Sequence, residues 1–252
     1  MLDRLFAALT LFTRLPFWRL RQVPAAAFAG ATAWWPAAGW LTGGTTALAL
    51  WLLAALFPPM LAVTLAFGVR VLLTGALHED GLADCCDGFG GGTTREKRLA
   101  IMKDSHIGTY GVLGLILYAL LLVQTVSLFS VDTAVRVVLV GDPLAKFLAA
   151  QLTNLLPYVR PLEQSKVGAY RRMDAVSLAI SALFGLLPLF VLLPKGYGSA
   201  LAAPLLLTAL LLLYLRRKIG GYTGDCCGAA FLLNELVFYL TVAAVYYGNL
   251  AG

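Results

Sequence analysis

The chain has 252 residues, of which 60% are hydrophobic and only 13% are charged, whereas soluble domains have about 25% charged residues. This composition excludes a soluble globular enzyme. A helix of about 20 residues crosses a bilayer, so seven crossings would take roughly 140 residues and leave no second domain. The net charge of +6 reports loop orientation in a membrane protein and does not indicate nucleic acid. We expect one integral membrane domain over residues 1–252, an all-α polytopic transmembrane helical bundle.

The N-terminal segment, residues 1–21, is predicted to be an amphipathic helix at the membrane interface. Its apolar residues at helical spacing are Leu2, Leu5, Phe6, Leu9 and Phe12. The apolar run is short and arginines follow it, which argues against a cleaved signal peptide.

Seven hydrophobic segments follow, each long enough or nearly so to cross a bilayer. The predicted spans cover residues 36–57, 60–78, 110–131, 133–157, 176–194, 199–215 and 229–249. Lys and Arg collect in the N-terminal segment and in the loops after the second, fourth and sixth spans, whereas the opposite loops contain only Lys195. By the positive-inside rule, the N-terminus and the long loops face the cytoplasm.

The segment 79–109 is predicted to be a cytoplasmic catalytic loop that is rich in acidic residues and glycine. Asp80, Asp84 and Asp87 have a spacing that places three carboxylates on one face of a helix. Their mutual repulsion favours a bound divalent cation, and carboxylate oxygens are ligands that Mg²⁺ prefers. A solvated acidic helix face is the alternative, but the adjoining span and glycines favour a magnesium site.

Glycines directly after the acidic face predict a turn whose N–H groups approach phosphate oxygens. Gly88, Gly90 and Gly91 belong to this turn. Arg95, Arg98 and Lys103 would add positive charge. A helix C-cap or a flexible loop would have similar glycines. Acids, glycines and cations together are the components of a phosphoryl-transfer site.

A second candidate element, residues 220–235, places Asp225 among glycines at the start of the last span. A glycine turn with one solvated acid is the alternative. Asn234 and Glu235 would lie about two turns inside the membrane, where a carboxylate indicates a functional site by default. Both are therefore predicted to belong to the site.

The roles of the histidines and of the cysteines stay open. His78 and His106 are the only histidines, and either could be a general base or a hydrogen-bonded structural residue. Asp-Cys-Cys occurs at 84–86 and again at 225–227. Neighbouring cysteines rarely form a disulfide with each other, so we expect reduced thiols. A zinc site is an alternative, but adjacent cysteines fit the spacing of zinc sites poorly.

Several motifs in order along the chain resemble those of the cobalamin synthase family, also called adenosylcobinamide-GDP ribazoletransferases. The motifs are H-x-D-G-L-A-D at 78–84, Asp87-Gly88, I-M-K-D at 101–104, I-G-T-Y-G at 107–111 and G-Y-T-G-D at 221–225. Further agreement lies at 12–16 and 35–39, so the resemblance covers most of the chain.

The resemblance implies a multi-pass enzyme of the bacterial inner membrane that depends on Mg²⁺ and has its active site on the cytoplasmic side. Such an enzyme joins adenosylcobinamide-GDP to α-ribazole or its 5′-phosphate, giving adenosylcobalamin or its 5′-phosphate and releasing GMP. Membrane lipid is a further expected partner. Association with other late cobalamin-assembly enzymes, or between copies of the chain, stays open.

The residues and the resemblance together predict the site. The metal ligands expected are Asp80, Asp84, Asp87 and Asp225. The catalytic residues expected are these four aspartates with His78, Lys103 and Asp104. The substrate-binding residues expected are Arg14, Gly88, Gly90, Gly91, Arg95, Arg98, His106, Arg160, Thr223, Asn234 and Glu235.

Two other functions are alternatives. A lipid enzyme of the CDP-alcohol phosphotransferase type uses related chemistry, but its acidic motif has Ala-Arg where this chain has Cys85-Cys86. A cation-coupled transporter would hold its carboxylates near the bilayer midplane, whereas the aspartates here lie at the ends of predicted spans.

Overall fold

The structure is a computed structural model, and it describes residues 1–161, 172–193 and 196–251. Helices make up most of these ranges. The described residues contain no β-strand, and the extended pairing among them is one isolated bridge between Tyr158 and Tyr222. The predicted all-α class is confirmed.

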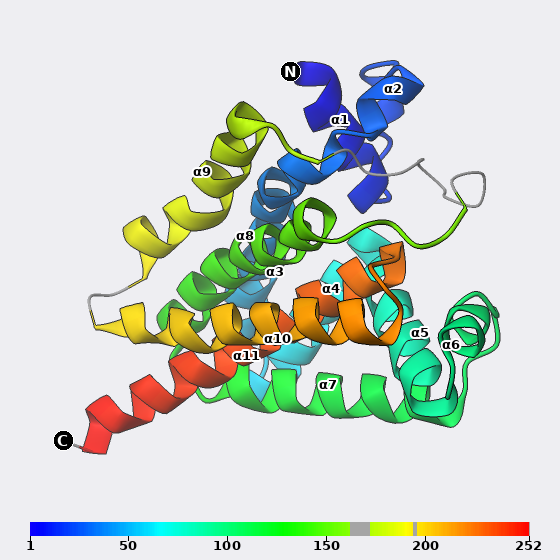
Figure 1. The fold of residues 1–252 in the computed structure, drawn as a ribbon. Helices are drawn as coiled ribbons and strands as arrows, with labels where there is room; N and C mark the ends of the chain where they lie inside the picture. Colours follow the sequence, from blue (N-terminus) through cyan, green and yellow to red (C-terminus); the bar gives the residue numbers. More distant parts are fainter. Residues whose placement is uncertain (162–171, 194–195, 252) are drawn as a thin grey trace.

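Long helices pack side by side to form a bundle (Figure 1). The long helices are α3 (Trp35–Ala54), α4 (Pro59–Thr74), α7 (Thr109–Ser127), α8 (Val131–Leu155), α9 (Ala175–Leu192), α10 (Ala202–Lys218) and α11 (Gly224–Ala251). The shorter helices are α1 (Leu2–Phe12), α2 (Ala25–Phe28), α5 (Leu77–Gly91) and α6 (Arg95–Ile101). Each predicted span therefore corresponds to a long helix, with its ends shifted by a few residues.

Within the described ranges, five helical segments are long and apolar enough to cross a membrane by themselves. They are 31–54, 109–127, 175–192, 197–218 and 224–248. A sixth candidate combines α4 and α5, which meet at a bend of 92°. Helix α8 has 25 residues, and its four charged residues lower its hydropathy. The protein is a multi-pass membrane protein, and about seven spans agrees with this arrangement.

The bend between α4 and α5 places the acidic segment across one end of the bundle. Gly75 and Ala76 both adopt left-handed backbone conformations, with φ of 66° and 57°, and the N–H groups of both donate to the carbonyl of Val71. Glycine adopts this conformation easily, whereas alanine adopts it at a cost of about 1 kcal/mol. The segment 79–109, predicted as a loop, is mostly helical, because α5 and α6 occupy it.

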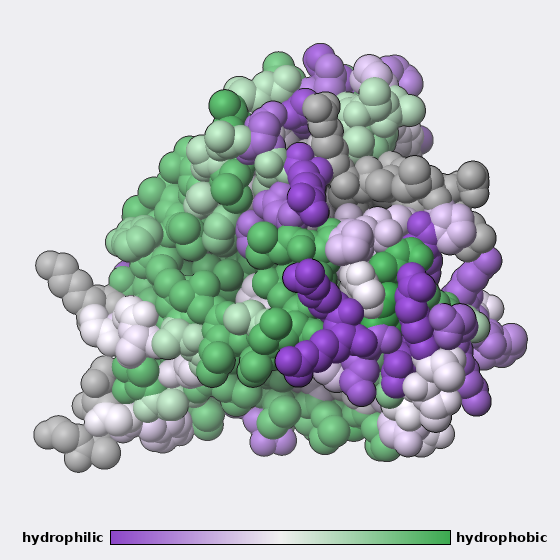
Figure 2. All heavy atoms as spheres, in the orientation of Figure 1, coloured by the Kyte–Doolittle hydropathy of each residue, from purple (hydrophilic) through white to green (hydrophobic). Residues whose placement is uncertain are grey.

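Hydrophobic residues cover much of the bundle surface, and hydrophilic residues gather over α5 and α6 at one end (Figure 2). The basic end of α10, Arg216–Lys218, is also exposed. The bundle thus has an apolar body, as a bilayer requires, and a polar end that carries the acidic helix.

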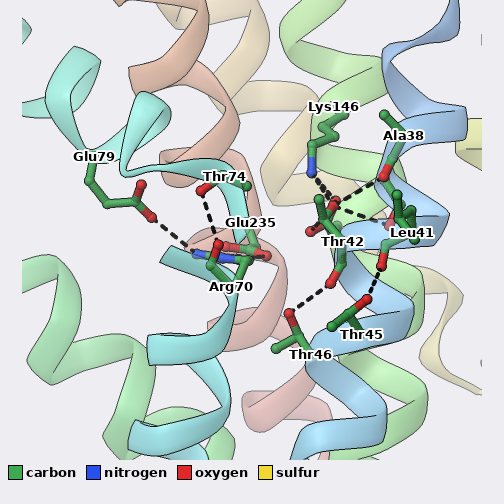
Figure 3. A network of polar contacts seen from close by, with 12 residues as sticks. Ala38, Leu41, Thr42, Thr45, Thr46, Arg70, Thr74, Glu79, Lys146 and Glu235 are labelled. Carbon is green, nitrogen blue, oxygen red and sulfur yellow. Dashed lines mark hydrogen bonds and ion pairs between the residues drawn. The ribbon is translucent and has the colours of Figure 1, made fainter. Parts of the chain in front are cut away.

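A buried ion pair joins α4 to α11 inside the bundle (Figure 3). Arg70 Nη1 lies 2.5 Å from Glu235 Oε1. The hydroxyls of Tyr118 and Tyr239 donate to the same carboxylate at 3.1 and 2.9 Å. Because every charge is paired and hydrogen-bonded, the cost of placing it in an apolar interior is reduced.

A second buried pair joins α8 to α3 (Figure 3). Lys146 pairs with Asp142 one turn earlier on α8, and the Thr42 hydroxyl on α3 bonds to both side chains. The Lys146 ammonium also lies 4.3 Å from the ring centre of Phe231. These contacts explain how α8 keeps charged residues inside the bundle.

Candidate active site

A close crossing of α5 and α11 forms the floor of the candidate site. A Cβ atom at Gly81 would lie only 2.8 Å from the carbonyl oxygen of Asp225. A Cβ at Gly228 would lie 3.2 Å from the carbonyl oxygen of His78. Because both glycines lack side chains, the two backbones approach closely. The crossing therefore brings the start of α11 beside the acidic face of α5.

Three carboxylates gather at this crossing. Asp80 and Asp84 lie one turn apart on α5, and Asp225 lies in the first turn of α11. Among the charges near Asp84, Asp225 repels its carboxylate most strongly, followed by Asp80. Asp80 is exposed, and the other two are half-buried. The structure thus brings three of the four predicted metal ligands together where solvent reaches them.

Arg160 is a cation within this group. Its Nη2 atom lies 2.7 Å from Oδ2 of Asp225 and donates to the carbonyl of Met102 at 3.0 Å. The same carboxylate oxygen accepts from the hydroxyl of Thr223 at 3.2 Å. Arg160 and Thr223, both predicted to bind substrate, therefore lie beside Asp225.

A short backbone pairing holds Arg160 in this position. The N–H of Tyr222 donates to the carbonyl of Pro157 at 2.9 Å, and the N–H of Val159 donates to the carbonyl of Tyr222 at 3.1 Å. Gly221 lies against Pro157 with no room for a side chain. The G-Y-T-G-D motif therefore orients both the arginine and the aspartate. The rest of the predicted basic loop, residues 162–171, lies outside the described residues.

Asp87 points to a different partner. Its carboxylate accepts hydrogen bonds from the N–H groups of Gly108 at 2.7 Å and Gly111 at 2.8 Å. These groups at the start of α7 lack partners within the helix and carry the positive end of its dipole. A Cβ at Gly108 would lie 2.5 Å from Asp87 Oδ1. The I-G-T-Y-G motif thus anchors α7 to α5, and metal binding by Asp87 stays a prediction.

The prediction of a glycine-rich turn after the acidic face is wrong, because α5 continues through Gly91. Within a helix each N–H bonds to the carbonyl four residues earlier, so the N–H groups of Gly88, Gly90 and Gly91 have partners in α5. Substrate contact by these glycines stays a prediction. Gly88 lies against Met102, and a Cβ at Gly90 would lie 2.5 Å from the ring of Tyr110. These glycines let neighbouring segments pack on α5.

Arg95 and Arg98 fasten α6 to the end of α10. Arg95 Nε donates to the carbonyl of Ile219 at 2.8 Å, and Arg98 Nη1 donates to the carbonyl of Lys218 at 3.3 Å. Carbonyls at a helix C-terminus lack partners within the helix and attract cations. Contact of the two guanidinium groups with phosphate stays a prediction.

Arg14 and the 103–106 segment lie on the polar end of the bundle. The guanidinium of Arg14 lies against Gly75, at the bend that precedes α5. Lys103 is exposed. His106 has a 91% exposed side chain, and its Nδ1 lies 2.7 Å from Oδ1 of Asp104. The hydrogen bond with His106 holds the pKa of Asp104 below its usual value.

His78 lies in the core and not in the open part of the site. It is 2% exposed, and its ring centre lies 4.7 Å from that of Phe231, 5.6 Å from that of Trp35 and 6.2 Å from that of Phe12. Its Nε2 atom has no hydrogen-bond partner among the described residues. A role as general base stays a prediction that this aromatic surrounding does not favour.

The two predicted site residues deeper in α11 make contacts between helices. Glu235 pairs with Arg70, and Asn234 accepts from the hydroxyl of Thr208 at 3.0 Å. Both residues are fully buried. Their substrate contact stays a prediction.

The two Asp-Cys-Cys copies face each other across the crossing of α5 and α11. The thiols of Cys85 and Cys226 are hydrogen-bonded to each other, and all four cysteines are free. The repeated motif therefore packs two helices together, as thiols without a disulfide.

Comparison with known proteins decides the family. The model of the cobalamin-5-phosphate synthase family matches residues 4–243. The chain belongs to the cobalamin-5-phosphate synthase family. The family resemblance drawn from the motifs is thus confirmed.

Relatives of this family member are named adenosylcobinamide-GDP ribazoletransferase. That of Shewanella oneidensis is 37% identical over 248 residues, covering 97% of this chain and 95% of the relative. That of Shewanella frigidimarina is 38% identical over 255 residues, with coverage of 97% and 95%. That of Shewanella baltica strain OS185 is 37% identical over 253 residues, with coverage of 99% and 96%. No solved structure matches the chain.

In this member of the synthase family, the carboxylates at the crossing of α5 and α11 have the oxygen ligands and the negative charge that a hard cation requires. Asp80, Asp84 and Asp225, with Arg160 among them, leave two negative charges, which one divalent cation would balance. In the part of the chain that the structure describes, no three His, Cys, Asp or Glu side chains already converge tightly enough to hold a metal. Binding would therefore require the carboxylates to close around the ion.

Proposed function

We propose that this chain is an adenosylcobinamide-GDP ribazoletransferase, the activity for which its relatives are named. The observation that carries the proposal is the meeting of Asp80, Asp84 and Asp225 with Arg160 at the polar end of a membrane bundle. Carboxylates for a metal and a guanidinium for phosphate are what phosphoryl transfer needs. The position of the carboxylates at the polar end of the bundle also disfavours a transporter, whose ion site lies near the midplane.

The proposed reaction joins two substrates at one phosphorus atom. A ribose hydroxyl that α-ribazole and its 5′-phosphate share loses its proton, and its oxygen forms a bond to the phosphorus that carries the cobinamide. The 5′-oxygen is not this nucleophile, because it already carries phosphate in the second substrate and keeps that phosphate in the product. The bond from that phosphorus to the bridging oxygen breaks, and GMP leaves with this oxygen. The products are adenosylcobalamin, or its 5′-phosphate, and GMP.

Each residue of the candidate site has its own proposed role in this reaction. Arg160, half-buried and oriented by Met102, would pair with the phosphate group. Asp80, Asp84 and Asp225 would hold Mg²⁺, which when bound supplies positive charge to the pyrophosphate. Asp80 is the most exposed of the three, so it is better placed than the buried His78 to accept the hydroxyl proton.

We also propose that the protein lies in the bacterial inner membrane with its N-terminus and active site in the cytoplasm. The positive-inside pattern of the loops supports this orientation. A periplasmic reporter enzyme fused after residue 248 should be active, whereas the same reporter after residue 21 should be inactive. The reverse result would contradict the orientation without affecting the proposed reaction.

The activity is tested by release of GMP from adenosylcobinamide-GDP by the purified protein in detergent or lipid. GMP should appear only when α-ribazole or its 5′-phosphate and Mg²⁺ are both supplied, and EDTA should abolish it. GMP release that persists in EDTA would contradict the metal assignment. Release of CMP from a CDP-linked lipid, with no GMP, would instead indicate the lipid enzyme.

Substitution of one carboxylate tests whether it acts in the reaction or only in folding. Asp84→Asn should lower GMP release by at least about 100-fold, because it removes a charged metal ligand, while the protein still inserts in the membrane. Asp132→Asn is the matched control, because Asp132 is an exposed aspartate on α8 that pairs with Arg136. Full activity in Asp84→Asn would contradict the role of this carboxylate.

A further inference from the structure

A small polar cavity lies between α1, α2 and the N-terminal end of α9, away from the candidate active site. Its volume is about 90 Å³, several times what a single water molecule needs. The polar side chains that line it are Arg4, Thr32, Arg172, Asp174 and Ser177. The stem of Arg4 packs on Gly30, where a Cβ would lie 3.0 Å from the arginine Cδ. The glycine thus leaves room for the guanidinium to reach the cavity.

One buried hydroxyl in this cavity lacks a partner. Thr32 is 2% exposed, and its Oγ1 atom has no hydrogen-bond partner among the described residues. A buried hydroxyl without a partner costs free energy unless a ligand or water satisfies it. Arg4 Nη1 donates to Ser177 Oγ at 3.4 Å, which is a long hydrogen bond that leaves further donors on the guanidinium.

The helix end and the charges both favour an anion. Helix α9 has 18 residues, and its first turn begins with the N–H of Ser177 donating to Asp174 Oδ1 at 2.7 Å. The N-terminal end of a helix attracts negative charge. Among the described residues that line the cavity, Arg4 and Arg172 with Asp174 give a net charge of one positive. A phosphodiester carries one negative charge and matches it.

The surface that continues from the cavity is apolar. Helix α9 is long and apolar enough, over residues 175–192, to cross a membrane, and such a crossing would place its N-terminal end at the level of lipid headgroups. Below that end α9 exposes Val176, Leu183, Phe190 and Val191, and Figure 2 shows hydrophobic surface along this flank of the molecule. Acyl chains would contact this flank while a headgroup occupied the cavity.

We propose that this cavity binds the phosphodiester group of a membrane phospholipid, with its acyl chains along α9. Arg4 and Arg172 would pair with the phosphate oxygens, and the Thr32 hydroxyl would donate to one of them. The lipid would hold the interfacial helix α1 against α9. This proposal does not depend on the proposed transferase reaction.

Native mass spectrometry of the whole protein in detergent, titrated with phosphatidylglycerol, tests the proposal. Arg4→Gln should weaken binding of the first lipid by about tenfold or more, because it removes hydrogen bonds to a charged group. Thr32→Val should cause a smaller loss with an unchanged side-chain shape. Arg19→Gln, at an exposed arginine of the same interfacial segment, is the matched control and should bind as the unsubstituted chain does.

A second variant and a competition experiment give results that could contradict the proposal. If Arg4→Gln does not fold, Arg172→Gln, at an exposed residue, should show the same loss. Equal lipid binding in the Arg172→Gln variant and the unsubstituted chain would overturn the proposal. Competition by soluble glycerol phosphate at concentrations similar to those of the lipid would also overturn it, because the occupant would then be a free phosphate. GMP release is not used as a readout, so failure of the transferase proposal is distinguishable.

Discussion

Aspartates that look equivalent in the sequence have different surroundings in the structure. Asp87 accepts two N–H groups from the start of α7, and Asp225 pairs with Arg160. Asp80 and Asp84 stand beside them on the open side of α5. Partners thus decide which carboxylates can serve chemistry, since a carboxylate already held by backbone donors has fewer free lone pairs for a metal.

Arg160→Gln tests the phosphate role at the scale of one residue. We expect kcat/KM for GMP release to fall by about 10- to 100-fold, because a hydrogen bond to a charged group contributes about 1.5–3 kcal/mol. Arg216→Gln, at an exposed arginine of α10, should leave kcat/KM within about twofold, since surface charges contribute little. Equal values for the Arg160→Gln variant and the unsubstituted chain would show that this arginine only orients Asp225.

At the scale of elements, glycines determine how close the helices come. Gly81 and Gly228 let α5 and α11 cross with their backbones in contact, and Gly108 lets the start of α7 reach Asp87. Gly88 and Gly90, which suggested a phosphate-binding turn, likewise lie against Met102 and Tyr110. Small residues at such crossings are typical of membrane helices, because van der Waals contact drives their association.

Gly81→Ala tests the crossing of α5 and α11. The new Cβ would lie 2.8 Å from the carbonyl oxygen of Asp225, so the helices must separate, at a cost of about 1–3 kcal/mol. We expect a lower unfolding temperature and reduced GMP release. Gly68→Ala in α4 is the control, because no atom lies within 4 Å of its added Cβ and alanine favours a helix. A lower unfolding temperature in both variants would indicate a general intolerance of substitution.

At the scale of the whole molecule, buried ion pairs hold an apolar bundle in one arrangement. Arg70 with Glu235 links α4 to α11, and the Thr42 hydroxyl links the Lys146–Asp142 pair of α8 to α3 (Figure 3). In a bilayer, apolar side chains contact lipid as readily as they contact one another, so they specify the packing of helices weakly. Charged partners on different helices specify it more strongly, because separation of α4 from α11 would leave Arg70 and Glu235 each alone in an apolar medium.

Arg70→Met tests this network. Removing one partner of a buried pair destabilises a protein by about 3–5 kcal/mol, and we expect that loss in unfolding by SDS in mixed micelles. Arg70→Met combined with Glu235→Met should recover much of the stability, since no lone charge remains. Arg136→Met, at an exposed pair on α8, should change stability by less than about 1 kcal/mol. A double variant no more stable than Arg70→Met would contradict this account.

Much of the architecture could be predicted from composition and periodicity. Scarce charge required a membrane, long apolar runs marked the seven long helices, and the spacing of Asp80, Asp84 and Asp87 matched the helix that the structure shows. Motifs in order along the chain were enough to indicate the family. These features are local in the sequence, and local pattern reports local structure and solvent.

The partners of individual side chains were decided only by the tertiary structure. Nothing in the local pattern showed that Glu235 pairs with Arg70, 165 residues earlier, or that Arg160 meets Asp225. The signal that could have found the first pair was the presence of opposite charges inside two predicted spans. The glycine segment predicts a turn, but glycine favours close packing as well as turns. Which of the two it serves depends on what lies opposite, and that is a property of the folded bundle.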